Sequence, residues 1–357
     1  MIRHPATQKF NSIQILRAFA AWMVVYHHFI AMYFSWKTDN IIGKFFGIYG
    51  SFGVDVFFVI SGFVMYIIAT GRKQTARSFM IGRIFRIVPA YWLYTLTIPV
   101  FLFFFPTTFA FSTYNFESLA CSLFFVPTEN PSGIGIIPLL TVGWTLNFEM
   151  FFYATLAICL LINKRFAIPL CFVVILILPL VYPKNVAYSS VASNPLLFEF
   201  IQGFLIAFLA TNEHTTRFLS RYRALAVALT AVIVAVFVFM LHKHYPFVKE
   251  PLAGWIVLLA VLSEPYVNTS FAIVRNLVRL GDESFSTYLV HIIVIGIFLH
   301  FTGNDLSRTG QLAILAGISI VVWLASMVSY RNVEQSRRLA GMHRMLFIPI
   351  RVGGHGS

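Results

Sequence analysis

An arginine and two histidines lie within one apolar stretch near the start of the chain. Arg17 precedes His28 by 11 residues, close to three helical turns, so both side chains share one helix face while His27 points roughly 100° away. A neutral imidazole can accept a proton from a hydroxyl near neutral pH, which acyl transfer to an alcohol requires. The alternative is a histidine hydrogen-bonded across a bundle for packing, and the residues alone leave both interpretations open.

Two carboxylates also interrupt apolar sequence. Asp55 lies among aromatic residues in FGVDVFFVISGF, and Glu149 lies in GWTLNFEMFFY. An ionisable group inside a spanning helix costs roughly 2.5–3.5 kcal/mol, so each should have a partner. Asp55 is expected to bond a polar group of a neighbouring helix, with catalysis as the alternative, and Ser61–Gly62 favours close helix packing. Glu149 could orient a histidine, as carboxylates do in catalytic dyads, or hold two helices together.

Two arginines spaced i, i+3 come just before Pro89. Adjacent guanidinium groups suit phosphates, which they bind bidentately, so Arg83 and Arg86 could hold an anionic donor. The alternative is an ordinary cluster of positive charge on the cytoplasmic side. Further along the chain, Tyr288 and His291 share one helix face, and His291 could be catalytic, donor-contacting or structural.

The elements that position these residues must be helices in a membrane. Apolar residues make up 59% of the 357-residue chain, charged residues only 11%, and the mean hydropathy is +0.80. A soluble domain carries about 25% charged residues, so this chain needs a bilayer as its solvent. The net charge of +13 falls in short clusters between long apolar runs. A preference for positive cytoplasmic loops explains this distribution, and nucleic-acid binding does not.

Ten segments are interpreted as spanning helices, although several are short. They cover roughly 13–34, 46–69, 88–107, 139–162, 166–182, 195–211, 224–241, 250–264, 282–302 and 310–330. With a cytoplasmic N-terminus, 20 of the 26 Lys and Arg residues fall inside and 6 outside, which supports this count. The predicted fold class is therefore all-α: a polytopic transmembrane bundle of about ten helices with both termini cytoplasmic. Residues 13–330 form the membrane domain, 1–12 and 331–357 are its cytoplasmic ends, and 118–127 is an interfacial or re-entrant piece.

Other common chemistries lack their motifs. The chain has no GxxxxGK[ST], HExxH or GxSxG and no Rossmann glycine pattern. Cys121, Cys159 and Cys171 lie in apolar runs without CxxC spacing, so neither a disulfide framework nor a zinc site is expected. We predict no metal and no permanently bound cofactor.

Five segments, taken together and in order, resemble the acyltransferase 3 family of bacterial membrane proteins, and within it the subgroup concerned with exopolysaccharide production. They are QILRAFAAWMVVYHH, FGVDVFFVISGFVM, FMIGRIFRIVPAYW, VGWTLNFEMFFY and LGDESFSTYLVH. Their shared order over about residues 11–300 makes the resemblance specific. It implies transfer of an acyl group, commonly acetyl from acetyl-CoA, onto a hydroxyl of a cell-surface glycan or a similar acceptor.

The resemblance also implies roles for single residues. In the pattern that begins at Arg17, it makes His28 the catalytic residue, and it makes Arg83 and Arg86 contacts of the coenzyme A donor. Glu149 falls where the family often shows W-S-L-S-x-E. Here that stretch reads WTLNFE, so the glutamate is retained while both serines are replaced, and no role for serine hydroxyls carries over.

The expected function is that of an integral-membrane O-acyltransferase of the bacterial inner membrane. The candidates are His28, Glu149 and Asp55 for catalysis, Arg83, Arg86 and Arg17 for the donor, and His27, Tyr288 and His291 as further site residues. The expected partners are an acyl-CoA, a carbohydrate acceptor (exopolysaccharide or lipid-linked sugar), membrane lipid and polysaccharide-biosynthesis machinery. Direct transfer and relay through an acylated protein group both remain open. The rival interpretations are a transporter or flippase that uses the same charges as a relay, and a non-catalytic partner of a polysaccharide synthase.

Overall fold

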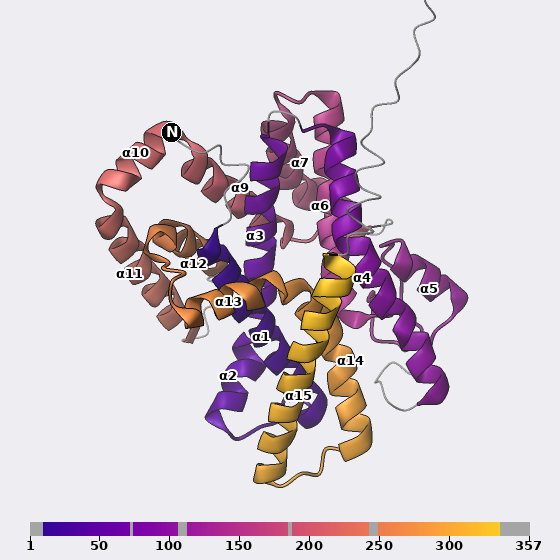
Figure 1. Ribbon diagram of the computed structural model, residues 1–357. Helices are drawn as coiled ribbons and strands as arrows, with labels where there is room; N and C mark the ends of the chain where they lie inside the picture. Colours follow the sequence, from indigo (N-terminus) through magenta and orange to yellow (C-terminus); the bar gives the residue numbers. More distant parts are fainter. Residues whose placement is uncertain (1–9, 72–73, 106–112, 185–187, 243–248, 336–357) are drawn as a thin grey trace, which may run out of the picture.

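The computed structural model describes residues 10–71, 74–105, 113–184, 188–242 and 249–335, and every regular element in these ranges is helical (Figure 1). The α-helices are α1 (Asn11–Phe34), α2 (Ile41–Tyr49), α3 (Phe52–Ala69), α4 (Ala76–Phe104), α5 (Phe116–Leu123), α6 (Trp144–Ile162), α7 (Ala167–Val181), α8 (Ser189–Ala192), α9 (Leu197–Thr211), α10 (Glu213–Arg221), α11 (Arg223–His242), α12 (Lys249–Ser263), α13 (Ala272–Asp282), α14 (Ser284–Thr302) and α15 (Arg308–Ser329). A π-helical turn, Tyr330–Glu334, follows α15.

Each of the ten predicted segments coincides with a helix, namely α1, α3, α4, α6, α7, α9, α11, α12, α14 and α15. In the described ranges, seven helices are long and apolar enough to cross a bilayer, and α7 and α9 are shorter apolar helices. The all-α membrane fold is therefore confirmed. The number of crossings and the side of the termini stay predictions, and the predicted tail lies outside the described residues from 336 onward.

The start of α4 differs from the prediction, which placed the third spanning segment at 88–107. The helix begins at Ala76, because Thr75 forms a capping box with the residue three positions later. The polar and basic first turns of this helix lower its apolar content, so hydropathy alone misses them. Arg83 and Arg86 consequently lie inside the helix rather than in front of it.

Two short helices lie between the long ones. Helix α2 takes residues 46–49, which the prediction assigned to the second spanning segment, so that α3 begins only at Phe52. Helix α5 covers the first part of the predicted interfacial piece. A hydrogen bond of 2.8 Å from Trp92 Nε1 to the Leu123 carbonyl oxygen holds α5 to α4. The placement of α5 relative to the bilayer stays a prediction.

Helix α1 is the element around which the polar residues gather. It packs against α3, α13 and α14, and in Figure 1 the orange helix α13 crosses beside it. Its first N–H groups, of Asn11 and Ser12, donate to the Glu264 carboxylate at 3.0 and 2.7 Å, where a negative charge also favours the helix dipole. A Cβ atom at Gly281 would lie 1.8 Å from the Gln14 carbonyl oxygen, so only glycine lets α13 press this closely against α1.

Helices α3 and α9 also make a close backbone contact that bears on the site. A Cβ atom at Gly62 would lie 2.1 Å from the Phe200 carbonyl oxygen, and one at Gly203 would lie 2.1 Å from the Val59 carbonyl oxygen. The close packing predicted at Ser61–Gly62 is therefore confirmed, and it fixes the face of α3 that carries the serine.

Candidate active site

Helices α1, α3, α4, α6 and α14 surround a cavity of about 830 Å³, a volume that includes the space at its mouth. Much of its wall is apolar, including Phe57, Phe58 and Met65. Its polar wall residues are Arg17, Ser61, Arg83, Arg86, Thr145, Glu149, Tyr153 and Tyr288. Three guanidinium groups and one carboxylate give the wall a net positive charge, which favours an anionic ligand.

Arg83 has hydrogen-bonding capacity to spare. Its Nε atom is buried and has no hydrogen-bond partner among the described residues. A buried donor left unsatisfied costs about 1–3 kcal/mol, and more when it is charged. This N–H is therefore available to an anionic group that enters the cavity.

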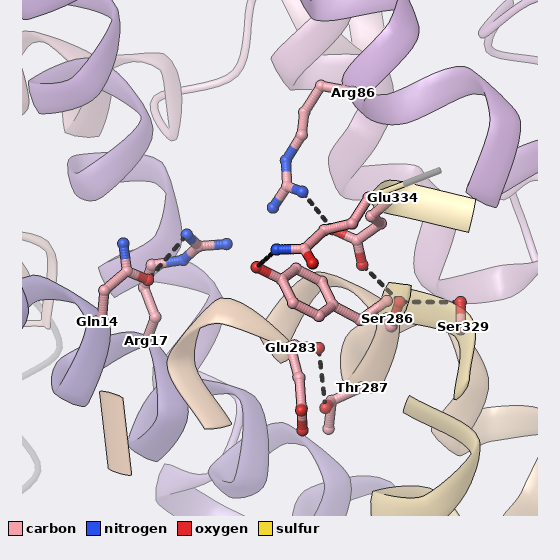
Figure 2. A network of polar contacts seen from close by, with 10 residues as sticks. Gln14, Arg17, Arg86, Glu283, Ser286, Thr287, Ser329 and Glu334 are labelled. Atoms are coloured by element: carbon pink, nitrogen blue, oxygen red, sulfur yellow. Dashed lines mark hydrogen bonds and ion pairs between the residues drawn. The ribbon is translucent and has the colours of Figure 1, made fainter. Parts of the chain in front are cut away.

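Arg86 is held by a partner from the far end of the chain, as Figure 2 shows. Its guanidinium forms an ion pair with Glu334, the last residue of the π-helical turn, and lies 5.5 Å from the centre of the Phe285 ring. The Glu334 side chain is 1% exposed and also accepts a hydrogen bond from the Ser286 hydroxyl, which in turn contacts Ser329. A negative group already occupies one of the positions that an anionic ligand would take on Arg86.

Arg17 reaches the same cavity from α1. Its Nη1 atom donates at 3.2 Å to the side chain of Gln14, which lies one turn earlier on α1, and this hydrogen bond holds the guanidinium in place. In Figure 2 the guanidinium groups of Arg17 and Arg86 point toward the same space from different helices. The three arginines predicted to bind the donor are thus brought together.

Glu149 lies in this cavity and not beside a histidine. Its carboxylate accepts a hydrogen bond of 3.0 Å from the Tyr153 hydroxyl, which lies 3.1 Å from Ser61 Oγ. This chain of contacts ties α6 to α3, so the expectation that Glu149 holds two helices together has a structural counterpart. Among the described residues, no contact joins Glu149 to a histidine, so the alternative that Glu149 orients a histidine finds no support in these contacts.

His28 meets His291 across the interface of α1 and α14. The Nδ1 atom of His28 lies 3.2 Å from Nε2 of His291 and 3.0 Å from the Val24 carbonyl oxygen. The two rings are 5.0 Å apart, and the ring of Tyr288, a wall residue of the cavity, is 5.9 Å from that of His291. Tyr288 therefore links the cavity to the histidine pair, and neither His28 nor His291 is a wall residue.

Tyr288 is fixed by two hydrogen bonds of its hydroxyl. It donates to the Val142 carbonyl oxygen at 2.9 Å and lies 2.9 Å from Thr145 Oγ1. These contacts pin α14 to the start of α6, and the tyrosine ring both lines the cavity and lies next to His291.

His27 and Asp55 belong to other surroundings. His27 Nδ1 lies 3.1 Å from the Phe46 carbonyl oxygen, and its ring is 4.6 Å from that of Trp36. This agrees with the helical-wheel argument that His27 points away from Arg17 and His28. Asp55 forms an ion pair of 3.1 Å with Lys249, so the expectation of a polar partner on a neighbouring helix is confirmed. Neither residue lines the cavity.

Sequence reasoning missed two residues of the site. Tyr153 was detectable, because it follows Glu149 by four positions and must face it on a helix. Glu334 carried no such signal, since 248 residues separate it from Arg86.

The described residues thus form an all-helical membrane protein whose interior holds clustered arginines and a histidine pair. The family model described as an acyltransferase domain, Acyl_transf_3, matches residues 10–330, and the chain belongs to this family. It is 35% identical over 258 residues to the exopolysaccharide production protein ExoZ of Rhizobium meliloti (strain 1021), which covers 70% of this chain and 77% of that protein. No match was found among solved structures. The protein is therefore a multi-pass membrane acyltransferase, and it is similar to a protein of exopolysaccharide production.

Proposed function

We propose that the protein transfers an acyl group, in the first instance acetyl, from an acyl-CoA to a hydroxyl of an exopolysaccharide or another cell-surface glycan. It would do so in the bacterial inner membrane, with ten crossings and both ends in the cytoplasm. The observation that carries the proposal is the cavity in which Arg17, Arg83 and Arg86 converge. Three guanidinium groups inside an apolar bundle suit a multiply charged, phosphate-bearing donor.

The donor would enter with its phosphates at the arginines. The Arg83 N–H without a partner and the guanidinium of Arg86 supply the direct contacts, and Glu334 must give up its place on Arg86. Arg17 and His28 are 11 positions apart on α1, a rise of about 16 Å. The pantetheine arm, which is long, flexible and narrow, would span this distance along the apolar wall past Tyr288 and bring the thioester to the histidine pair.

His28 would act as general base. Its Nε2 atom takes the proton of the acceptor hydroxyl, the hydroxyl oxygen attacks the thioester carbonyl carbon, and the C–S bond breaks. The proton then passes from His28 to the departing thiolate, so the products are an ester and coenzyme A with a free thiol. Glu149 and Asp55 lie apart from this step, Glu149 beside the arginines and Asp55 on Lys249.

Radiolabelled acetyl-CoA added to proteoliposomes with candidate glycans tests the proposal. The expected result is labelled glycan from the wild-type protein and at least about a hundredfold slower labelling from His28→Ala. If label crosses the membrane without joining a glycan, the protein is a transporter. If no label moves, it is a partner of another enzyme. Label that appears on the protein before it appears on the glycan would indicate a relay rather than direct transfer.

A further inference from the structure

The imidazole of His291 is fully buried, at 0% exposure, and both of its nitrogens have defined neighbours. Nδ1 lies 3.2 Å from the Thr287 carbonyl oxygen, one turn earlier on α14, and Nε2 lies 3.2 Å from Nδ1 of His28. A carbonyl oxygen can only accept a hydrogen bond. The hydrogen of a neutral His291 must therefore be on Nδ1, which leaves a lone pair on Nε2.

The same reasoning fixes the hydrogen of His28. Its Nδ1 faces two acceptors, the Val24 carbonyl oxygen at 3.0 Å and the lone pair of His291 Nε2 at 3.2 Å. A hydrogen on Nδ1 serves both in a three-centre bond. In any other neutral arrangement a lone pair would face a carbonyl oxygen within 3.2 Å at one or both rings. The contacts thus select a single arrangement, with Nδ1–H on both rings.

This arrangement leaves Nε2 of His28 as the nitrogen with a lone pair to offer. When that atom accepts a proton, Nδ1–H becomes part of an imidazolium, and its bond to His291 becomes charge-assisted and stronger. The neutral Nε2 atom of His291 accepts from Nδ1–H of His28 and so orients the ring, as a carboxylate orients the histidine of a Ser-His-Asp triad. Glu149 and Asp55, the carboxylates that could have filled it, are engaged elsewhere.

We propose that His291 is a positioning residue, which holds the ring of His28 so that Nε2 is the base and then stabilises the protonated ring. The assignment of a base to His28 rests on the proposed function, whereas the position of the hydrogens does not. His291 touches neither donor nor acceptor and acts only through His28.

Two substitutions of His291 separate this role from packing. In His291→Gln the side-chain oxygen can occupy the place of Nε2 and accept from His28. In His291→Asn the amide can replace Nδ1 toward Thr287, but it is too short to reach His28. Both are buried amides of similar polarity, so they form a matched pair. We expect His291→Asn to lower kcat by about tenfold to a hundredfold, less than the loss of the base itself, with KM for acetyl-CoA unchanged. His291→Gln should keep at least about ten times the kcat of the asparagine variant.

Nitrogen-15 NMR of histidine-labelled protein reads the hydrogens directly and does not depend on activity. The expected spectrum of the wild type shows His28, assigned by its absence in His28→Ala, with hydrogen on Nδ1 and none on Nε2. His291→Asn should broaden or shift these signals, and His291→Gln should restore them. Hydrogen on Nε2 of wild-type His28, or equal kcat in the two variants, would overturn the proposal. If the spectrum is as expected and no glycan is ever acetylated, the proposed function fails and the hydrogen-bond assignment stands.

Discussion

Replacement of Glu334 by glutamine is expected to tighten the binding of acyl-CoA. The Glu334 carboxylate is 1% exposed and pairs with Arg86, whose side chain is 33% exposed, so it competes with any phosphate for that guanidinium. A unit charge 4 Å away contributes about 4 kcal/mol at an effective dielectric constant of 20, which is an upper limit. Pairs that reach solvent contribute up to about 1 kcal/mol. The pair of Glu334 and Arg86 lies between these cases. We therefore expect removal of the Glu334 charge to strengthen acetyl-CoA binding by about 1–2 kcal/mol, which lowers Kd roughly five- to thirtyfold.

Glutamine keeps the shape of Glu334 and an oxygen that can still accept from Ser286, so the substitution removes mainly the charge. The assay is equilibrium binding of radiolabelled acetyl-CoA to the purified protein without acceptor. Glu283→Gln is the matched control, because Glu283 is also buried and paired with an arginine, but its partner Arg279, unlike Arg86, does not line the cavity. Weaker binding by Glu334→Gln, or the same change in the control, would refute the idea that Glu334 competes with the donor.

Substitutions of Arg83, His28 and Gly62 test the donor site, the base and the helix packing in turn. Arg83→Ala should raise KM for acetyl-CoA about tenfold or more, since charged hydrogen bonds contribute about 1.5–3 kcal/mol, and an unchanged KM would remove Arg83 from the donor site. His28→Ala should lower kcat by about 10²–10⁴-fold while His27→Ala retains most of the activity, and the reverse order would show that the base is misassigned. Gly62→Ala should lower the thermal midpoint of unfolding, because a Cβ atom 2.1 Å from the Phe200 carbonyl oxygen overpacks α3 against α9 at a cost of about 1–3 kcal/mol. A midpoint equal to that of the wild type would show that the two helices can separate without loss.

Local patterns in the sequence predicted much of the fold. Apolar run length located a helix for each of the ten segments, and helical periodicity placed Arg17 and His28 apart from His27. The start of α4 was missed because a capping box, not an apolar run, begins that helix, and its first turns carry charge. Hydropathy identifies the apolar turns of a helix, and it does not identify turns whose side chains are polar or charged.

Contacts between residues far apart in the chain could not be predicted from the sequence. His28 and His291 are 263 residues apart, and Arg86 and Glu334 are 248 apart. Which helices become neighbours depends on close contacts such as that of Gly281 with Gln14, and no periodicity within one segment specifies these. The residue types that form the site could therefore be predicted, but the partner of each histidine and arginine could not.

A structure of the protein with a non-transferable thioether analogue of acetyl-CoA would show whether the donor binds at the arginines and reaches the histidine pair. We expect phosphate groups within hydrogen-bond distance of Arg83 and Arg86, Glu334 displaced from Arg86, and the sulfur atom next to Nε2 of His28. Phosphates bound away from the arginines, or a sulfur atom far from His28, would contradict the account.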